Sequence, residues 1–363
     1  MDGFVLKRYH ADGGDRHYLS LFFGQDWSNC ENIVLPFSKN SRIHGSSCGG
    51  LFYFDNLKGR IIICNPTTKT FKSLDPPKML NPPNMTTFHS SGFGYDRISD
   101  DYKVVSLFSH NYCRDMDYYS DYDVVAKAEV FSLKRGSWKE INSHVDLCSE
   151  LRYGWDTHMN GIYINGVCYW STDEYTIRSF DFTDECFSSF ELPVNNIDDD
   201  DELSFKYDLI KVNDMLGVFF HENFPPLGPD CFGFSTTFEL LVRKEGSWVP
   251  LYNVNLCDIV RPLLFNEDRF LFLEKQLSER FSQLVVYDLK EEKLEELDIY
   301  DYRKVMTIMP YVEDRFLLRH SKPMEDGCYS KDEEKEEDRN KLLEWMRRME
   351  RRRRRTGTSY WSR

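Results

Sequence analysis

The sequence lacks the marks of several large protein classes. No segment reaches the roughly 18 consecutive apolar residues that a membrane-spanning helix needs, and the start, Met1–Arg8, has no apolar stretch typical of a secretory signal. The 10 cysteines are scattered, without a Cys-x-x-Cys pair. In a reducing compartment such cysteines act mostly as small buried apolar residues. We therefore expect a cytoplasmic, disulfide-free protein without a membrane segment.

Motifs for catalysis are also missing. The chain has no Gly-x-Gly-x-x-Gly or Gly-x4-Gly-Lys-[Ser/Thr] phosphate loop and no His-Glu-x-x-His motif. Gly45, Ser47 and Gly49 match the letters of a nucleophile elbow, but that motif requires a following helix, and Leu51–Phe54 has the pattern of a strand. We interpret His44–Gly50 as a glycine-rich turn that leads into this strand. No catalytic residue, cofactor or enzymatic activity is predicted.

Two groups of residues have side chains that bind metals, but neither has the spacing of a metal site. His44, Cys48 and Cys64 are zinc-binding residue types, but they lack the paired spacing of a zinc motif. The acidic run Asp198–Glu202 has no glycine-assisted turn for calcium, so a solvated loop is the preferred interpretation. The pair Asp100-Asp101 is interpreted as the turn before a strand at Tyr102–Phe108.

Little positive charge balances the acidic residues. The chain carries 46 Lys+Arg and 60 Asp+Glu, a net charge of −14, which argues against nucleic-acid binding and permits a basic protein partner. Residues 331–363 hold 12 basic and 8 acidic residues, so the other 330 residues carry −18. Within this tail, Arg351–Arg355 is a candidate nuclear address, although a self-neutralising solvated helix is the preferred interpretation.

A pattern of twelve residues recurs five times. Each copy starts with an apolar strand end, continues through about six polar or turn residues, and has large apolar residues at its ninth and twelfth positions. The copies are Ile63–Leu74, Val130–Ile141, Ser179–Phe190, Leu240–Leu251 and Val286–Leu297. The ninth residues are Phe71, Trp138, Phe187, Trp248 and Leu294. This pattern is typical of a β-hairpin.

Hairpins repeated at 46 to 67 residues predict an all-β, kelch-type β-propeller. Strands near both termini, Tyr18–Phe23 and Ile33–Leu35 with Lys304–Met309 and Arg315–Leu318, would share one blade and close the ring. Five repeats and this shared blade predict about six blades; a β-sandwich is the alternative. We expect the propeller domain at residues 1–320 and a charged helical or disordered tail at residues 321–363. Pro76–Pro83 is predicted to be a connector.

Nine short motifs follow one another in a distinctive order. They are Phe4–Arg8, Ile43–Leu51, Cys64–Phe71, Gly92–Asp96, Asp101–Val105, Ala128–Leu133, Ser137–Ile141, Ile164–Trp170 and Ile177–Asp181. This order resembles that of plant F-box-associated domains, and most of all that of the S-locus F-box proteins of pollen. The resemblance covers roughly residues 4–320 and is looser in the second half. It implies a protein-binding module that recognises targets for an SCF (Skp–cullin–F-box) ubiquitin ligase, such as a secreted, basic ribonuclease.

Two features depart from that family pattern. No helical segment resembling an F-box precedes Phe4, and the Arg-rich tail is extra. An F-box binds the Skp adaptor and through it the cullin, so an alternative function is a decoy or regulator that binds targets without a ligase. A remoter alternative is a propeller-fold hydrolase or oxidoreductase. No partner-binding residue is assigned from the sequence.

Overall fold

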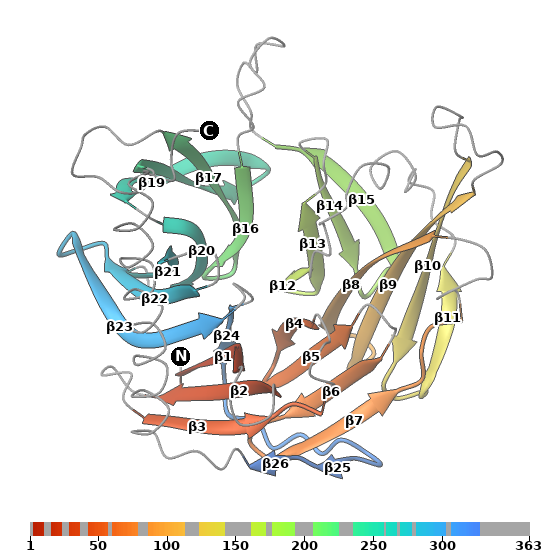
Figure 1. Cartoon of the computed structure of the whole chain (residues 1–363). Helices are drawn as coiled ribbons and strands as arrows, with labels where there is room; N and C mark the ends of the chain where they lie inside the picture. The colour runs from red at the N-terminus through yellow and green to blue at the C-terminus, as the bar shows by residue number, and fades with distance from the viewer. Residues whose placement is uncertain are drawn as a thin grey trace.

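The chain folds into six antiparallel sheets arranged as blades around a central axis (Figure 1). A computed structural model describes residues 3–10, 16–23, 29–36, 43–56, 60–78, 86–112, 123–141, 161–171, 176–192, 206–224, 235–257, 259–266, 269–277, 281–302 and 306–326. Within these residues the only regular secondary structure is β-strand, so the prediction of a six-bladed, all-β propeller is confirmed.

The first strand named for each blade lies beside the axis, and the others follow outwards in order. Blade 1 contains β24 (Thr307–Tyr311), β1 (Gly3–His10), β2 (Arg16–Phe23), β3 (Asn29–Val34) and β26 (Glu325–Asp326). Blade 2 contains β4 (Ile43–Cys48), β5 (Leu51–Asn56), β6 (Ile61–Asn65), β7 (Thr70–Leu74) and β25 (Lys322–Pro323). Blade 3 contains β8 (Thr86–Asp96), β9 (Asp101–Tyr112), β10 (Asp123–Ser132) and β11 (Ser137–Ile141).

The other three blades have four strands each. Blade 4 contains β12 (Ile162–Ile164), β13 (Val167–Ser171), β14 (Thr176–Asp181) and β15 (Cys186–Glu191). Blade 5 contains β16 (Lys206–Val212), β17 (Met215–Phe224), β18 (Ser235–Lys244) and β19 (Ser247–Cys257). Blade 6 contains β20 (Ile259–Asn266), β21 (Phe270–Gln276), β22 (Phe281–Asp288) and β23 (Lys293–Tyr302).

Strands from the two ends of the chain share blade 1. The antiparallel pair β1–β24 runs from Gly3 opposite Tyr311 to Lys7 opposite Thr307, which confirms the predicted closure of the ring. Because β24 is the innermost strand of a blade whose next three strands come from the N-terminus, the backbone hydrogen bonds of this pair join the first and last parts of the fold.

The five sequence repeats form the two outer strands of blades 2 to 6, as predicted. The seventh residue of every repeat has positive φ: Lys69, Gly136, Glu185, Gly246 and Glu292. In three repeats the third residue is Asn65, Asp181 or Asp288, and its side-chain oxygen accepts N–H bonds from the turn. The left-handed residue ends a tight connection of four residues in blades 2, 3, 4 and 6 and of two residues in blade 5.

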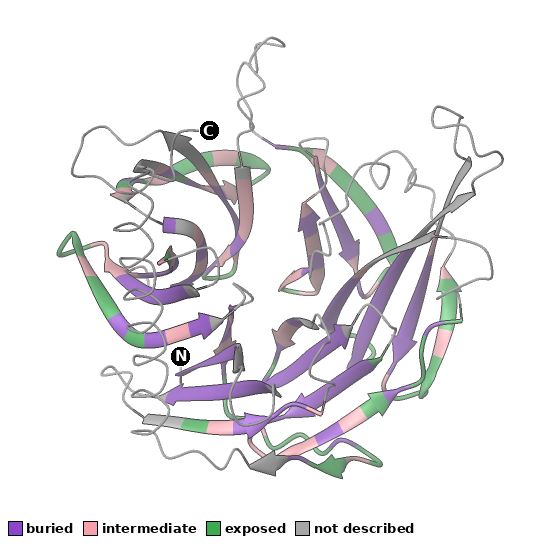
Figure 2. Cartoon of the chain, in the orientation of Figure 1, coloured by how far each residue is buried: buried purple, intermediate pink, exposed green. Residues whose placement is uncertain are grey.

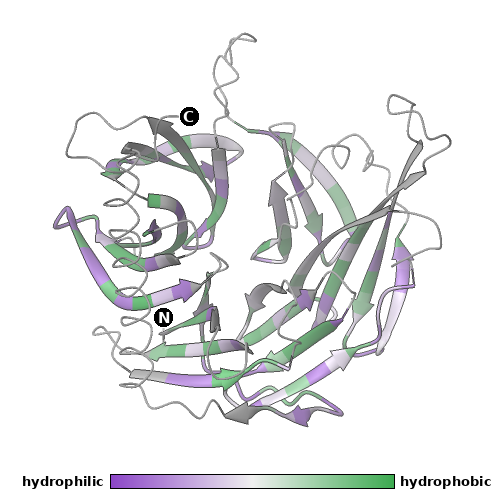
Figure 3. Ribbon diagram, in the orientation of Figure 1, coloured by the Kyte–Doolittle hydropathy of each residue, from purple (hydrophilic) through white to green (hydrophobic). Residues whose placement is uncertain are grey.

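The core is divided into six apolar layers, one between each pair of neighbouring blades. Phe4, Phe272 and Ile308 belong to the layer between blades 6 and 1, for example, and Tyr53, Phe93 and Phe131 to that between blades 2 and 3. Figure 2 shows that buried residues dominate the middle strands and exposed residues the outermost ones, and Figure 3 shows the same division in hydropathy. Fully burying each such side chain contributes about 1.5–3 kcal/mol.

Two local predictions were wrong. Ile43–Cys48 is the innermost strand of blade 2, so only Gly49 and Gly50, with φ of 55° and 77°, form the turn expected over the whole motif. Arg315–Leu318 is not a strand. It belongs to the segment Val312–Ser321, which contains no strand and runs from β24 towards blade 2. The carbonyls of Asp314 and Phe316 accept hydrogen bonds from the Asn65 side chain, not from a neighbouring strand, so no strand forms here.

Residues beyond 320 also contribute to the blades. Lys322 and Pro323 pair with β7, and Glu325 and Asp326 pair with β3. We call residues 312–326 the strap, since they join the inner strand of blade 1 to the outer edges of blades 2 and 1. The domain division at residue 320 and the function of the tail stay predictions.

Several predictions fall outside the described residues: the acidic run Asp198–Glu202, the helical tail with Arg351–Arg355, and residues 79–83 of the proline-rich connector. Pro76 and Pro77, which are described, lie in no strand. Among the residues that the structure describes, none belongs to a helix long and apolar enough to cross a membrane.

Asn65 connects the strap to blade 2 by hydrogen bonds, so its substitution tests how far the strap stabilises the fold. Its Nδ2 donates to the carbonyls of Asp314 (2.9 Å) and Phe316 (3.0 Å), while its Oδ1 accepts from Thr67 N. Asn65→Asp keeps the acceptor but removes the donor, so we expect the free energy of unfolding in urea to fall by about 1–3 kcal/mol. Asp181→Asn, in the equivalent turn of blade 4, is the matched control and should change stability less. Equal losses would contradict this role for the Asn65 amide.

Candidate functional site

One face of the propeller carries the short turns of the blades. Two turns of each blade from 2 to 5 lie at the same edge of the sheet: the turn between the first and second strands, and the turn between the third and fourth. In blade 2 these turns are Gly49–Gly50 and Pro66–Lys69. Neighbouring blades touch at this edge, as where Asn165 Nδ2 donates to the carbonyl of Asp214 (3.4 Å). We call this the turn face. The N-terminal end of β1 and the start of the strap also lie on it.

Large apolar side chains are exposed on the turn face. Ile98, Val312, Phe316 and Leu317 have exposed fractions of 82%, 49%, 39% and 78%. We call these four residues the exposed apolar surface. Within the described part of the chain, Val249 on β19 is the other large apolar residue exposed to a similar extent. Scattered exposed apolar residues need no explanation, but a group on one face is typical of a protein-binding surface.

Aromatic packing supports this surface from below. The Phe316 ring lies 5.1 Å from the ring of Tyr102, which also packs on Tyr95 (5.0 Å) and Phe93 (5.7 Å). Burial raises the pKa of Tyr102, so its hydroxyl stays protonated and donates to the carbonyl of Gly49 (3.3 Å). Buried Leu318 joins the same apolar layer between blades 2 and 3.

Hydrogen bonds hold the strap in one conformation although it is not a strand. Besides the two bonds from Asn65, Asp314 N donates to Thr67 Oγ1 (3.3 Å) and Phe316 N donates to Asp314 Oδ1 (2.9 Å). The hydroxyls of Thr67 and Tyr311 lie 2.8 Å apart. The apolar side chains of the strap are therefore presented to solvent on a fixed backbone, which lowers the entropy lost on binding.

The turn that carries Ile98 is anchored by a buried ion network between blades 3 and 4. Lys103 Nζ contacts Asp96 Oδ2 (3.0 Å), Glu185 Oε1 (3.0 Å) and the carbonyl of Phe182 (2.8 Å). Asp96 also accepts from Ile98 N (3.0 Å) and from Thr183 Oγ1 of blade 4 (2.9 Å).

The network shifts the ionisation of its members. Burial alone would raise the pKa of Asp96, but hydrogen bonds from Ser99, Lys103 and Thr183 outweigh it and hold that pKa well below its ordinary value. The pKa of Glu185 is lowered in the same way, with Lys139 and Lys103 outweighing its burial. For Lys103 burial is outweighed by Asp96 and Glu185, which raise its pKa. All three groups are therefore charged near neutral pH.

The sequence motifs considered for chemistry do not form a reactive site. Gly45 and Ser47 lie within β4 and a second strand follows Gly49, so the strand-to-helix turn of a nucleophile elbow is absent there. Cys48 lies in the layer between blades 2 and 3, whereas Cys64 lies between blades 1 and 2, so they face opposite sides of the sheet. Burial raises the pKa of Cys48 to about 12 and that of Cys64 further, which opposes zinc binding. No group of metal-ligating side chains occurs among the described residues.

Sequence reasoning missed both the ion network and the exposed apolar surface. Asp100, with φ of 51°, ends the turn as predicted, whereas Asp101 is already the first residue of β9, one position before the predicted strand. That prediction did not reveal that Asp96, at the start of the same turn, binds a lysine. Lys103 lies on the next strand of the same hairpin, but Glu185 lies 82 positions beyond Lys103 and Thr183 lies 87 positions beyond Asp96, so only the contact between blades brings these residues into the network.

The ion network predicts a dependence of stability on pH. Folding lowers the pKa of these carboxyl groups. Their contribution to stability is therefore complete at pH values above the unfolded pKa of about 4, and it is lost as the pH falls from there towards the folded pKa. At pH 7, Asp96→Asn should lower the free energy of unfolding by about 3 kcal/mol. The difference in the free energy of unfolding between this variant and the original chain, measured by urea titration, should shrink as the pH is lowered from 5 to about 2. Asp184→Asn, exposed on the neighbouring turn, should show no such trend; a constant difference for Asp96→Asn would refute the network's role.

Sequence comparison places the chain among known propellers. Residues 10–247 match the sequence model of the F-box associated beta propeller domain. An F-box/kelch-repeat protein of Arabidopsis thaliana is 26% identical over 240 residues, which cover 64% of this chain and 57% of that protein. F-box protein CPR1 of the same plant is 33% identical over 105 residues, covering 28% of this chain and 25% of that protein. The chain thus spans between a quarter and just over half of the length of these relatives.

Structural comparison finds TolB from Acinetobacter baumannii, with a TM-score of 0.47 and 12% identity over 85% of this chain and 67% of that one. The assignment depends on the family match instead, which covers well over half of the chain and agrees with the six-bladed, all-β architecture. The chain belongs to the family of F-box associated β-propeller domains.

Proposed function

We propose that this chain recognises a protein target for an SCF-type ubiquitin ligase, and that it binds the target through the exposed apolar surface of the turn face. The observation that carries the proposal is the grouping of Ile98, Val312, Phe316 and Leu317 on one face. The family to which the chain belongs, matched over residues 10–247, supports a protein as the ligand. The module holds its target without chemistry of its own.

A narrower proposal concerns the class of target. The resemblance to S-locus F-box proteins suggests a basic secreted ribonuclease, and the net charge of −14 supports a basic partner through long-range attraction. The same charge argues against nucleic acid. Ligase action of this kind fits the cytoplasmic location predicted from the sequence.

Target capture by tagged variants tests the surface. Leu317→Asp places a charge where a partner's apolar side chains would bury it, so we expect recovery of co-purifying plant proteins, identified by mass spectrometry, to drop at least about tenfold. Val249→Asp is the matched control, because Val249 is also exposed (39%) but lies on β19, away from this surface. Unchanged recovery with Leu317→Asp, or equal loss with both variants, would rule out the exposed apolar surface as the binding site.

The same experiment tests the link to a ligase. Recovery of the Skp adaptor and a cullin together with the target supports membership in an SCF complex. Recovery of the target without either component contradicts that membership and favours a decoy or regulator.

A further inference from the structure

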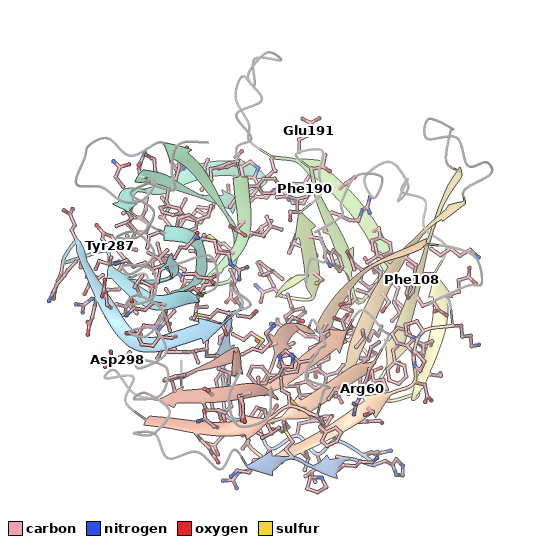
Figure 4. The ribbon with its side chains drawn as sticks, viewed as in Figure 1. Arg60, Phe108, Phe190, Glu191, Tyr287 and Asp298 are labelled. Carbon is pink, nitrogen blue, oxygen red and sulfur yellow. The ribbon has the colours of Figure 1, made fainter. Side chains whose placement is uncertain are left out.

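The apolar layer between blades 4 and 5 is less completely buried than the others. Among the described residues, it is the one layer in which partly buried side chains outnumber buried ones. Two of the partly buried side chains, Phe190 on β15 and Trp248 on β19, belong to the outermost strands of these blades. Phe190 is labelled in Figure 4 and lies on the side of blade 4 that faces blade 5. The layer is therefore accessible from the rim of the propeller.

Arg243 extends into this layer without a carboxylate to balance its charge. It lies on β18 opposite Trp248, and its guanidinium stacks on the Phe190 ring, 3.6 Å from the ring centroid. Nε is buried and makes no hydrogen bond, whereas Nη1 and Nη2 are not buried. No residue that the structure describes forms an ion pair with this guanidinium, although Arg261 and Arg269 both bind carboxylates. The cation–π contact thus fixes the group and leaves its Nη donors available.

Two more donors beside Arg243 have no acceptor. The rings of Tyr169 and Phe190 lie 6.4 Å apart. Burial raises the pKa of Tyr169, and Arg243 opposes the rise, so the hydroxyl is close to this cation and protonated near neutral pH. Neither this hydroxyl nor the indole N–H of Trp248 makes a hydrogen bond to any described residue, and neither is buried. We call Tyr169, Phe190, Arg243 and Trp248 the donor cluster.

The equivalent tryptophan of blade 3 has the acceptor that Trp248 lacks. Trp138 and Trp248 are the ninth residues of their repeats, and Trp138 Nε1 donates to the carbonyl of Asp75 (2.7 Å), the residue that follows the repeat of blade 2. The corresponding residue for Trp248 is Glu191, which follows the repeat of blade 4 and is labelled in Figure 4. Within the described part of the chain, no hydrogen bond joins Trp248 to Glu191. Blades 4 and 5 therefore lack the outer bond that Trp138 makes between blades 2 and 3.

A carboxylate is the ligand that matches these donors best. The planar donors of a guanidinium bind carboxylates in pairs, and the phenol and indole groups beside it supply further hydrogen bonds. One unpaired cation balances one carboxylate, whereas the second charge of a phosphate would have no partner. The net charge of −14 also opposes a larger anion. The partly exposed rings of Phe190 and Trp248 offer an apolar surface for the stem of the ligand's side chain.

We propose that the donor cluster binds the side-chain carboxylate of a glutamate or aspartate on a protein partner. The cluster lies between blades 4 and 5, whereas Ile98 and the strap lie on blades 1 to 3. The site is therefore separate from the exposed apolar surface. It does not depend on the proposed function, and either can fail alone.

NMR titration of the isotope-labelled full chain, at low salt and pH 7, tests the proposal through the indole N–H signal of Trp248. This signal is assigned as the one that Trp248→Phe removes. The probe is the peptide N-acetyl-Ala-Glu-Ala amide, and N-acetyl-Ala-Gln-Ala amide is its neutral counterpart. We expect a saturable shift of the Trp248 signal with the glutamate peptide and none with the glutamine peptide, because only the former brings a charge to Arg243.

Variants assign the shift to the donor cluster. Arg243→Gln should weaken binding of the glutamate peptide at least about tenfold. Lys244→Gln is the matched control, because Lys244 is exposed on the next position of β18, where side chains alternate between the two faces, and it carries the same charge. Its affinity should be unchanged. Tyr169→Phe keeps the ring and removes the hydroxyl, so it should weaken binding several-fold and serves as the test if Arg243→Gln does not fold.

Three results would overturn the proposal. Absence of a saturable shift would leave the stacking of Arg243 on Phe190 as a purely structural contact. Equal binding of the glutamine peptide, or unchanged affinity in both Arg243→Gln and Tyr169→Phe, would show that no carboxylate binds at these donors. Tighter binding of N-acetyl-Ala-Gln-Ala with a free terminal carboxylate than of the glutamate peptide would assign the site to a chain terminus instead of a side chain.

Discussion

The pairing of β1 with β24 is the constraint on which the rest of the molecule depends. Each blade is apolar on both faces and is covered only by its two neighbours, so an open ring would expose one face of blade 1 and one of blade 6. Phe4, which packs on Phe22 (4.8 Å) and Phe272 (5.0 Å), lies at that junction. Five backbone-paired positions of β1 and β24 therefore hold together an apolar layer that neither end of the chain could form by itself.

The strap adds a second connection across the same part of the ring. It leaves the inner end of blade 1, is bonded by Asn65 of blade 2, and ends as outer strands of both blades. This path explains why apolar side chains remain exposed on the turn face. Leu318 points into the layer between blades 2 and 3, whereas Val312 and Leu317 are not covered by a blade and remain 49% and 78% exposed.

Buried charge in this propeller lies mainly where blades meet. The Asp96–Lys103–Glu185 network joins blades 3 and 4 at the turn face, and Arg261, paired with Glu274, joins blades 6 and 1 by donating to the carbonyl of Met306. Buried ion pairs add little net stability, since desolvation offsets their attraction, but losing one partner is expensive. Their positions thus favour a single angle between neighbouring blades. The two groups differ in one respect: the first is fully paired by its own residues, whereas the second leaves Glu274 Oε1 without a donor.

The sequence by itself determined the β-class, the five outer hairpins and the shared first blade. These depend on local alternation and turn chemistry, which a twelve-residue window contains. The apolar ninth residues of the repeats, such as Trp138 and Phe187, pack between blades. Tertiary structure alone decided which side chains meet across blades. Lys103 with Glu185, Asn65 with the strap, and Arg261 with the carbonyl of Met306 are separated by 45 to 251 positions, and no local pattern encodes such pairs. The strap escaped prediction for a physical reason: its backbone is bonded by a side chain, so it has neither the alternation of a strand nor the composition of a loop.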